Sequence, residues 1–338
     1  MRELLKVNLR LFDDVTNATT STGSGNNLSA EMKTYYSKYL IKTARPNLVH
    51  DQFGQKHPIP KNGGKSIEFR KYTPLKKATT PLTEGVTPDG SPLDVSTVTS
   101  TVKQYGNWIP LTDMLLLTAI DNNMIQALDL LGANAGVTLD TITREILNAG
   151  TVVRYAEGQV ASRAALTNEH KLTVKAVKMT VRDLKKQNAQ KIDGYYVGII
   201  HPDISFDLTE DPDWKEMSKY TTPELAFQGE IGRIAGVRFV ETTEAKIWAG
   251  AGATVGSTED HYDVYSTLIL GANAYGVTEI EGGGLETIVK QLGSGGTSDP
   301  LNQRATVGWK ATKTAERLVE QYMVRIETGS TFNDGEEN

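Results

Sequence analysis

A stretch rich in proline and glycine restricts the fold of this chain more than any other feature. Residues 73–92 contain four prolines and two glycines. Proline removes a backbone donor and glycine weakens regular structure, so this stretch cannot form a helix or a central strand. Strand-like patterns flank it, an alternating one at Ile67–Arg70 and a β-branched one at Val95–Val102. The sequence therefore predicts a long hairpin from about residue 54 to residue 108.

The predicted hairpin has few large apolar residues from which to build a core. A two-stranded hairpin alone is marginally stable in water. Loops of this length without secondary structure are usually functional or disordered. Either the hairpin is flexible, or something outside its own domain holds it in place.

The first sixty residues differ in character from the rest. Residues 13–30 are almost all Thr, Ser, Gly, Asn and Asp, which predicts a tether without a packed core. A helix is expected near Glu31–Lys42, with its tyrosines and Leu40 on one side. Residues 1–60 carry a net charge of +3, whereas the whole chain carries −5. Such a basic arm is either solvated surface or faces a polyanion.

The middle and end of the chain predict a mixed α+β protein. Apolar residues recur at steps of three and four from Asn122 to Ala149, which indicates a helix of about 40 Å. Gly132 and Gly136 within it indicate close packing against another backbone. A second amphipathic helix is expected from Val174 to Leu184. Strands are expected at Tyr195–Ile200, Val237–Glu241, Leu268–Ala272, Thr306–Ala311 and Gln321–Glu327.

Composition excludes several classes of function. The 338 residues include no cysteine, which removes thiol catalysis, disulfides, zinc fingers and iron–sulfur clusters and fits a reducing compartment. No apolar run approaches the roughly 18 residues of a membrane span. Charged residues from Arg2 to Arg10 interrupt any signal-peptide hydrophobic region. The length suggests two domains, and we expect a soluble protein made inside the cell.

The sequence shows no catalytic, cofactor or metal site that stands out. His201 is the strongest candidate, because six acidic residues follow it within fifteen positions. They indicate either a metal or acid/base cluster, or a helix that begins at Pro202-Asp203 and carries acids in its first turn. The glycine-rich loop Gly250–Gly256 misses the dinucleotide-binding spacing, and no P-loop is present. An enzyme without a legible active site stays open as an alternative.

Several sequence blocks resemble one family. They are FGQ (53–55), PIPKNGGKSIEFRKYTPL (58–75), ATTPLTEGVTPDG (78–90), QYGNWIPLTD (104–113), GEIGRIAGVRF (229–239) and DPLNQRATVGWKA (299–311). These blocks resemble the major capsid proteins of tailed bacteriophages with the Hong Kong 97-type fold, and in particular the subfamily of the coliphage N-four coat protein. The resemblance extends from about residue 31 to residue 327.

This resemblance implies a domain organisation. Residues 1–52 would form the N-terminal arm, and residues 53–110 the extended loop, a β-hairpin that lies across an adjacent subunit. Residues 111–169 would form the peripheral domain with its long spine helix, and residues 170–298 the axial domain. Residues 299–338 would supply strands that return to the peripheral domain, followed by the C-terminal tail.

The resemblance also implies a function. The chain would be a major capsid protein, not an enzyme, that assembles as pentamers and hexamers into an icosahedral head around double-stranded DNA. Its partners would be copies of itself, a portal, scaffolding or decoration proteins, and packaged DNA bound non-specifically on the inner face, with no membrane and no cofactor. It would reside in the virion after assembly in the host cytoplasm. A shell protein of a phage-derived nanocompartment has the same fold and stays open as an alternative.

Five residues are candidates for contacts within or between subunits. Arg70, Lys71 and Glu84 lie on the expected extended loop, where they could pair with charges of a neighbouring subunit. Trp108 and Trp309 are expected to anchor packing in the peripheral domain. Each of the five could equally be ordinary surface or core.

Overall fold

The structure, a computed structural model, contains two units that are described separately. It describes residues 40, 43–44, 48–58, 65–72, 75, 77–85, 87, 89–118, 123–218, 232–256, 260–279, 285–295, 299–335 and 337–338. The smaller unit takes its described residues from 1–45, 105–135 and 285–311, and the larger unit from 46–104, 136–284 and 312–338. The expected tether and nearly all of the expected helix at 31–42 lie outside the described residues.

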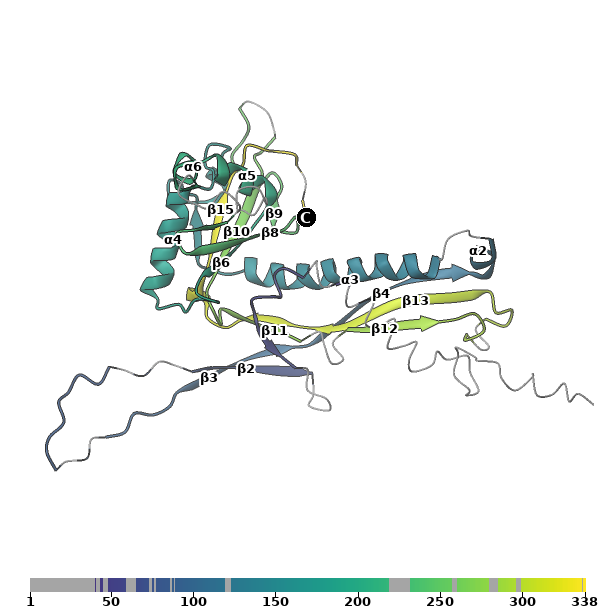
Figure 1. The fold of residues 1–338 in the computed structure, drawn as a ribbon, viewed down its shortest axis with the longest axis horizontal. Coiled ribbons are helices and arrows are strands. Elements are labelled where there is room, and N and C mark those ends of the chain that lie inside the picture. The colour runs from purple at the N-terminus through teal and green to yellow at the C-terminus, as the bar shows by residue number, and fades with distance from the viewer. Residues whose placement is uncertain are drawn as a thin grey trace, which may run out of the picture. The chain divides into compact units, whose positions relative to one another are not determined.

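The smaller unit is built on a three-stranded sheet in the order β12-β13-β4 (Figure 1). Its strands are β12 (Leu285–Lys290), β13 (Arg304–Lys313) and β4 (Lys103–Thr112). The helix α2 (Asp113–Thr118) follows β4 directly. The backbone amide of Asp113 donates to the carbonyl of Gln303, which joins the start of α2 to the segment before β13 (3.1 Å).

The long predicted helix is present as α3 (Asn123–Asn148), within one residue of its expected bounds at each end. Leu128, Leu131 and Ala135 are buried, as an apolar stripe requires. A Cβ on Gly132 would lie 2.8 Å from the Thr43 Cβ and 3.4 Å from the Leu40 carbonyl oxygen. The predicted close approach of another backbone at this glycine is therefore confirmed.

The larger unit has a seven-stranded sheet at its centre (Figure 1). The order is β5-β15-β10-β6-β8-β7, with β9 paired to β10. Three neighbouring strands, β15, β10 and β6, are buried along their whole length and form the middle of the core. The strands are β5 (Val153–Tyr155), β6 (Tyr196–Ile200), β7 (Arg233–Ile234), β8 (Val237–Glu241), β9 (Ile247–Trp248), β10 (Val264–Leu270) and β15 (Met323–Thr328).

Helices pack on this sheet because each has one apolar face. In α4 (Val174–Lys186), the apolar residues Val177, Val181 and Leu184 are buried in a cluster that includes Tyr196 and Ile269 of the sheet. The Thr173 hydroxyl accepts a hydrogen bond from the Ala176 amide and caps the helix (3.2 Å). The other helices of this part are α5 (Pro202–Glu210), α6 (Pro212–Ser218) and the short 3-10 turns η3 (Arg163–Ala165) and η5 (Glu320–Tyr322).

The predicted hairpin is also present in the larger unit. Strands β2 (Ser66–Tyr72) and β3 (Val95–Thr101) pair antiparallel, with Ser66 opposite Thr101 and Tyr72 opposite Val95. A separate three-stranded sheet has the order β1-β11-β14. Its strands are β1 (Gln55–His57), β11 (Tyr275–Thr278) and β14 (Ala315–Arg317).

Two strands near the ends of the expected domains have partners that are distant in the sequence. β12, in the range expected for the axial domain, pairs with β13 in the sheet of the smaller unit. β15, in the range expected for the return strands, pairs with β10 and β5 in the seven-stranded sheet. Strand partners are chosen by cross-strand packing and hydrogen bonding between distant segments, so chain order does not reveal them. Among the described helices, none is long and apolar enough to cross a membrane.

Candidate functional site

The base of the β2–β3 hairpin is anchored on the larger unit by one aromatic side chain. Phe69 of β2 is fully buried and clusters with Ile67, Leu318 and Val319. A Cβ on Gly276 of β11 would lie 2.5 Å from the Phe69 ring, so any side chain at this position would displace the ring. The anchor therefore depends on a phenylalanine that meets a glycine from a different sheet.

Polar contacts hold the second strand of the hairpin. The Ser100 and Thr314 hydroxyls are buried and lie 2.7 Å apart, which links β3 to the residue before β14. The amide of Val102 donates to the carbonyl of Lys65 and closes the base of the hairpin (2.8 Å). The sequence left open whether the hairpin is flexible or held from outside. Its base, at least, is held by its own unit.

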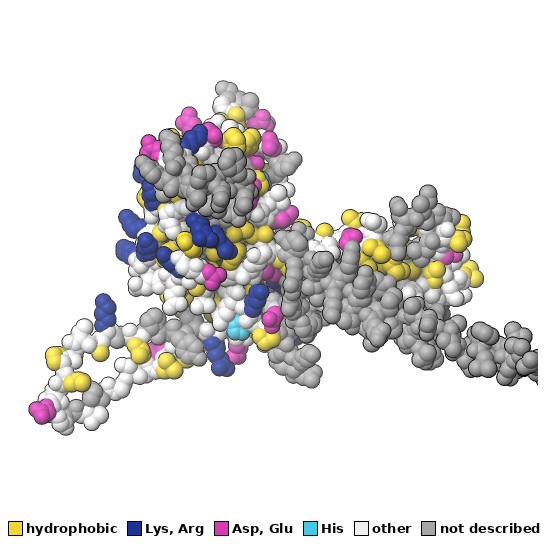
Figure 2. Space-filling model, viewed as in Figure 1, with side chains coloured by type: hydrophobic (Ala, Val, Ile, Leu, Met, Phe, Trp, Pro, Cys, Tyr) yellow, Lys and Arg dark blue, Asp and Glu magenta, His cyan; other side chains and the backbone are white. Residues whose placement is uncertain are grey.

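Beyond the base, the hairpin has no core. Every described residue from 75 to 97 is exposed. Apolar side chains are among them, with Leu75 62% exposed, Leu82 78% and Leu93 69% (Figure 2). A long loop without a core of its own is usually functional or disordered. We call the described residues of 75–94 the loop tip, and we regard it as the first candidate interaction surface.

The three candidate residues on the hairpin differ in what the structure shows. Arg70 on β2 and Glu84 in the loop tip are exposed, and neither forms an ion pair with another described residue. Lys71 lies in β2 opposite Ser96 of β3. The two exposed side chains are therefore available to charges outside this chain.

The two candidate tryptophans lie on opposite faces of the smaller unit's sheet. Trp309 of β13 is 3% exposed, and its indole nitrogen donates to the Asn134 amide oxygen of α3 (3.2 Å). Asn107 of β4 bonds the same oxygen, so its strand neighbour Trp108 points to the opposite face. Trp108 is 62% exposed and lies beside Gly308. It does not anchor packing within the described residues, contrary to expectation, because strand alternation directs it away from α3.

A buried ionic cluster joins three distant segments of the larger unit. The Lys313 ammonium, 1% exposed, forms an ion pair with Asp51. The Thr143 hydroxyl of α3 donates to the other oxygen of Asp51 (2.5 Å). Burial of a charge is costly unless it is paired and hydrogen-bonded, and both conditions are met here.

A second buried pair lies beside the first in the sequence. The backbone amide and Nδ1 of His50 contact the two oxygens of Asp140 at 2.7 Å and 2.6 Å. The Tyr275 hydroxyl donates to the His50 carbonyl, and burial raises the pKa of Tyr275 well above its usual value. Together, these pairs fix the chain just before β1 against α3 and β11. Sequence patterns could not reveal them, because the partners are 90 to 262 residues apart.

His201 has a structural role in the larger unit. It is the N-cap of α5, and its Nδ1 accepts the Asp203 amide (3.3 Å) while Pro202 begins the helix. Burial lowers the pKa of His201, and the charges of Asp203 and Glu241 partly oppose this. Among the described residues, no group of His, Asp and Glu could hold a metal ion. The cap at His201, with Pro202 and Asp203 in the first turn of α5, supports the helix-start interpretation of this acidic region.

The cap at His201 leads to a pH-dependent prediction. We expect His201→Ala to lower the free energy of unfolding by about 0.5–2 kcal/mol, as loss of a cap does, and His201→Asn to lower it less because asparagine also caps.

Since the pKa of His201 is lowered in the folded state, the unfolded chain takes up the proton first as pH falls below about 6.5. Stability from this group is thus present above that pH and lost below it. Urea unfolding at several pH values should show a shallower acid decline for His201→Asn than for wild type. An equal decline would contradict this role.

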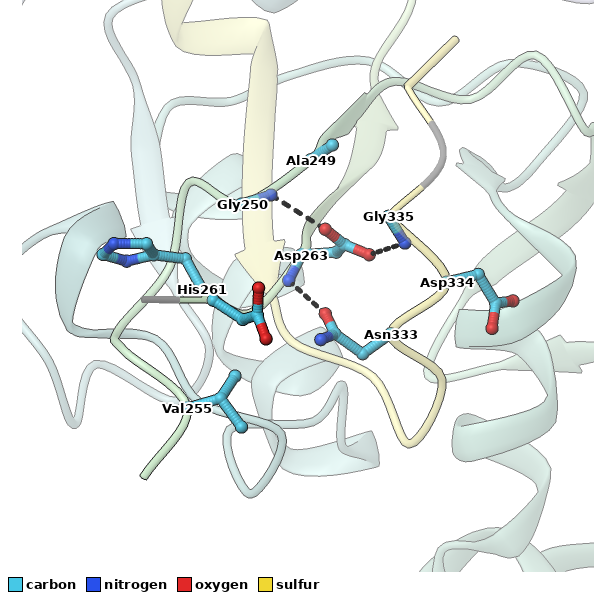
Figure 3. A pocket seen from close by; sticks show the side chains of 9 residues that line it. Ala249, Gly250, Val255, His261, Asp263, Asn333, Asp334 and Gly335 are labelled. Atoms are coloured by element: carbon cyan, nitrogen blue, oxygen red, sulfur yellow. Dashed lines mark hydrogen bonds between the residues drawn. The ribbon is translucent and has the colours of Figure 1, made fainter. Parts of the chain in front are cut away.

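The glycine-rich loop at 250–256 lines a cavity of about 560 Å³ (Figure 3). The Asp263 carboxylate accepts hydrogen bonds from the amides of Gly250 and Gly335, at 2.8 Å each. The Asp263 amide in turn donates to the Asn333 side chain (2.7 Å). Asp260 and Asp334 also line the cavity. Because the lining is acidic and the Gly250 amide is already bonded, this cavity is unsuited to phosphate.

Comparison with known proteins bears on the whole fold. Residues 140–292 match the family described as phage capsid protein. The chain has the fold of a phage capsid subunit. The capsid of Ralstonia phage GP4 matches with a TM-score of 0.64 and 14% identity, covering 81% of this chain and 86% of that chain. The capsid of cyanophage Pam1 matches with a TM-score of 0.64 and 13% identity, covering 94% and 98%.

A third capsid extends the same fold similarity. The capsid of cyanophage P-SCSP1u matches with a TM-score of 0.59 and 12% identity, and the match covers 84% of this chain and 89% of the cyanophage chain. No curated protein matches the chain in sequence. The family match and these structures agree on a capsid fold. The loop tip, exposed and without a core, is therefore the candidate contact surface of this fold.

Proposed function

We propose that this protein is the major capsid protein of a tailed bacteriophage and that it self-assembles into an icosahedral shell. The observation that carries the proposal is the match to the cyanophage Pam1 capsid, which covers nearly all of both chains. The family match at residues 140–292 supports it independently of the fold. So does a hairpin that is anchored at its base and exposes leucines at its tip.

The hairpin is the element that joins neighbouring subunits in this proposal. Residues 53–110 act as the extended loop, and the loop tip lies across an adjacent copy and buries its leucines there. Arg70, Lys71 and Glu84 pair with charges of that copy. Trp108, exposed on its own sheet, packs against a neighbour. Head-to-tail contacts of this kind close into rings, which suits pentamers and hexamers.

The remaining segments take the roles that the sequence resemblance implies. Residues 1–52 form the N-terminal arm, 111–169 the peripheral domain and 170–298 the axial domain, with 299–338 as return strands and tail. Within this proposal, the pairing of β12 with β13 suits a place for β12 in the peripheral domain, and the pairing of β15 with β10 suits a place for β15 in the axial domain. The block at 78–90 supports the coliphage N-four subfamily in particular.

The proposal includes partners and a location. The shell encloses double-stranded DNA, incorporates a portal, and assembles in the host cytoplasm with scaffolding or decoration proteins. The virion is its final location. The absence of cysteine from the sequence suits assembly in reducing cytosol.

Sedimentation of the purified protein tests this proposal. We expect capsomers or closed particles, visible by electron microscopy, because the exposed leucines of the loop tip need a partner. A strictly monomeric species at high protein concentration would count against a capsid role. Particles from infected or expressing cells that contain an enzyme and no DNA would identify a nanocompartment shell instead.

A further inference from the structure

One helix of this acidic protein concentrates positive charge. Residues 171–191, all of which the structure describes, contain seven Lys or Arg and one Asp, a net charge of +6. The chain as a whole has a net charge of −5. Figure 2 shows Lys and Arg side chains gathered on the part of the larger unit where Figure 1 draws α4. This concentration is not explained by the shell contacts proposed above.

The positive charges lie on one face of α4. Its cations recur at steps of three and four, which places them on one side of a helix. All are exposed, whereas the apolar residues between them are buried against the sheet. From the first to the last cation, the stripe is about 16 Å long. We call this surface the α4 basic face; it comprises Lys175, Lys178, Arg182, Lys185 and Lys186.

Only part of this charge is neutralised by the chain itself. Three of the cations have acidic partners: Lys175 with Glu157 at 2.8 Å, Lys178 with Asp213 at 3.5 Å and Arg182 with Asp183 at 3.0 Å.

Outside the face, Lys171 is also paired, with Asp207 at 3.4 Å, whereas the remaining cations of the segment are less compensated. Lys185, Lys186 and the nearby Lys191 form no ion pair with any described residue. Lysines in the last turn also complement the helix dipole. That effect does not extend to Lys191, which lies beyond the helix, so an excess of positive charge is left for an external partner.

The composition of this surface indicates the chemistry of the partner. No large hydrophobic side chain among residues 171–191 is exposed. Protein–protein interfaces are enriched in aromatic residues and depleted in lysine, which is the reverse of this face. Phosphate backbones are bound by Lys and Arg through charge, without apolar contacts. Duplex DNA carries about one negative charge per 1.7 Å of its axis, so a 16 Å stripe spans several phosphates.

We propose that the α4 basic face binds the phosphate backbone of duplex DNA without sequence preference. The inference rests on the proposed function, and it assigns to the larger unit a surface that faces the packaged genome. The contact is limited, because an acidic chain with one basic stripe engages few phosphates at a time. Such binding holds DNA near the shell without fixing it in place.

Salt-dependent DNA binding by unassembled protein tests this. The variant Arg182→Glu/Lys185→Glu/Lys186→Glu reverses three charges of the face, and Lys103→Glu/Lys290→Glu/Arg304→Glu reverses three exposed charges elsewhere. Binding to a short duplex of random sequence is measured by fluorescence anisotropy from about 50 to about 200 mM salt. We expect the first variant to reduce the slope of log K against log salt by about 2–3, since each phosphate that is no longer neutralised lowers the slope by about 0.9. The control should keep the wild-type slope.

Three results of the variant and competition measurements would overturn the proposal. They are an unchanged slope in the α4 variant, an equal loss in the control, and tighter binding of polyglutamate than of duplex DNA by the wild-type protein, which would indicate an acidic protein partner. If the triple variant does not fold by circular dichroism, Lys185→Gln/Lys186→Gln takes its place, with an expected slope change of about 1–2. Wild-type protein that forms shells but does not bind DNA would overturn this inference and leave the proposed function intact.

Discussion

Replacing residues 73–94 with Asn-Gly should abolish particle formation and leave a folded subunit. Tyr72 and Val95 are directly paired across β2 and β3, so a two-residue type I′ turn can close the shortened hairpin without changing the register. The described residues that are removed are all exposed, and the Phe69 anchor stays. Stability should therefore change little, whereas the leucines that we assign to the interface with a neighbouring copy are removed.

Two measurements separate folding from assembly in this experiment. Circular dichroism and urea unfolding should match wild type, and electron microscopy should show no shells. A milder variant, Leu75→Ser/Leu82→Ser/Leu93→Ser, keeps the loop length and should also impair assembly, because it removes exposed apolar surface. Substituting serine at the exposed polar residues Lys77, Thr79 and Asp89 provides the matched control. Normal shells from the shortened hairpin would refute the assignment of the loop tip.

Substituting Lys313 with methionine should lower the free energy of unfolding by about 3–5 kcal/mol. The change leaves the Asp51 carboxylate buried, and among the described residues the Thr143 hydroxyl alone still bonds it. An uncompensated buried charge is much more costly than the loss of an exposed pair. The two residues are 262 positions apart, so the substitution also frees the chain before β1 from β13.

Two controls accompany this prediction. One removes a lysine from an exposed ion pair, and the other replaces both members of the buried pair with neutral residues. Lys310→Met removes a lysine that is 45% exposed and 3.4 Å from Glu286, and it should cost less than about 1 kcal/mol. The double variant Asp51→Asn/Lys313→Met should recover much of the loss, because no buried charge stays unpaired. Urea unfolding of the four proteins gives the comparison. An equal decrease in the free energy of unfolding for Lys313→Met and Lys310→Met would show that the buried pair contributes no more to stability than the exposed pair.

The sequence predicts the helices and strands whose apolar residues recur at a regular spacing. The apolar stripe of α3 and the fully apolar strand β6 were found at nearly their observed bounds because their periods are visible in the sequence. The pairing of β2 with β3 is predicted because two strand patterns flank residues 73–92, whose prolines and glycines prevent regular secondary structure. Gly132 was expected to meet another backbone, and its closeness to Thr43 and Leu40 explains why.

What was missed depends on which distant segments meet. The partners of Asp51 and His50 are residues of ordinary type in unremarkable positions, so no pattern marks them. Trp108 resembles a core residue by its chemistry, yet the strand alternation set by Asn107 turns it outward. The five cations of the α4 basic face lie in a stretch of 21 residues with seven cations, but the charge of the whole chain is acidic and gives no sign of them.

The position of β15 in its sheet has a consequence for the order of events in the cell. Residues 323–328 pair with β10 on one side and β5 on the other, so they occupy an interior position in the sheet. While the ribosome is still translating, β5 and β10 have been made but lack the strand that lies between them. A chain cut short before residue 323 would leave that gap open and would be a substrate for proteases. We therefore expect chains that end before residue 323 to be cleaved by proteases before they can join other copies.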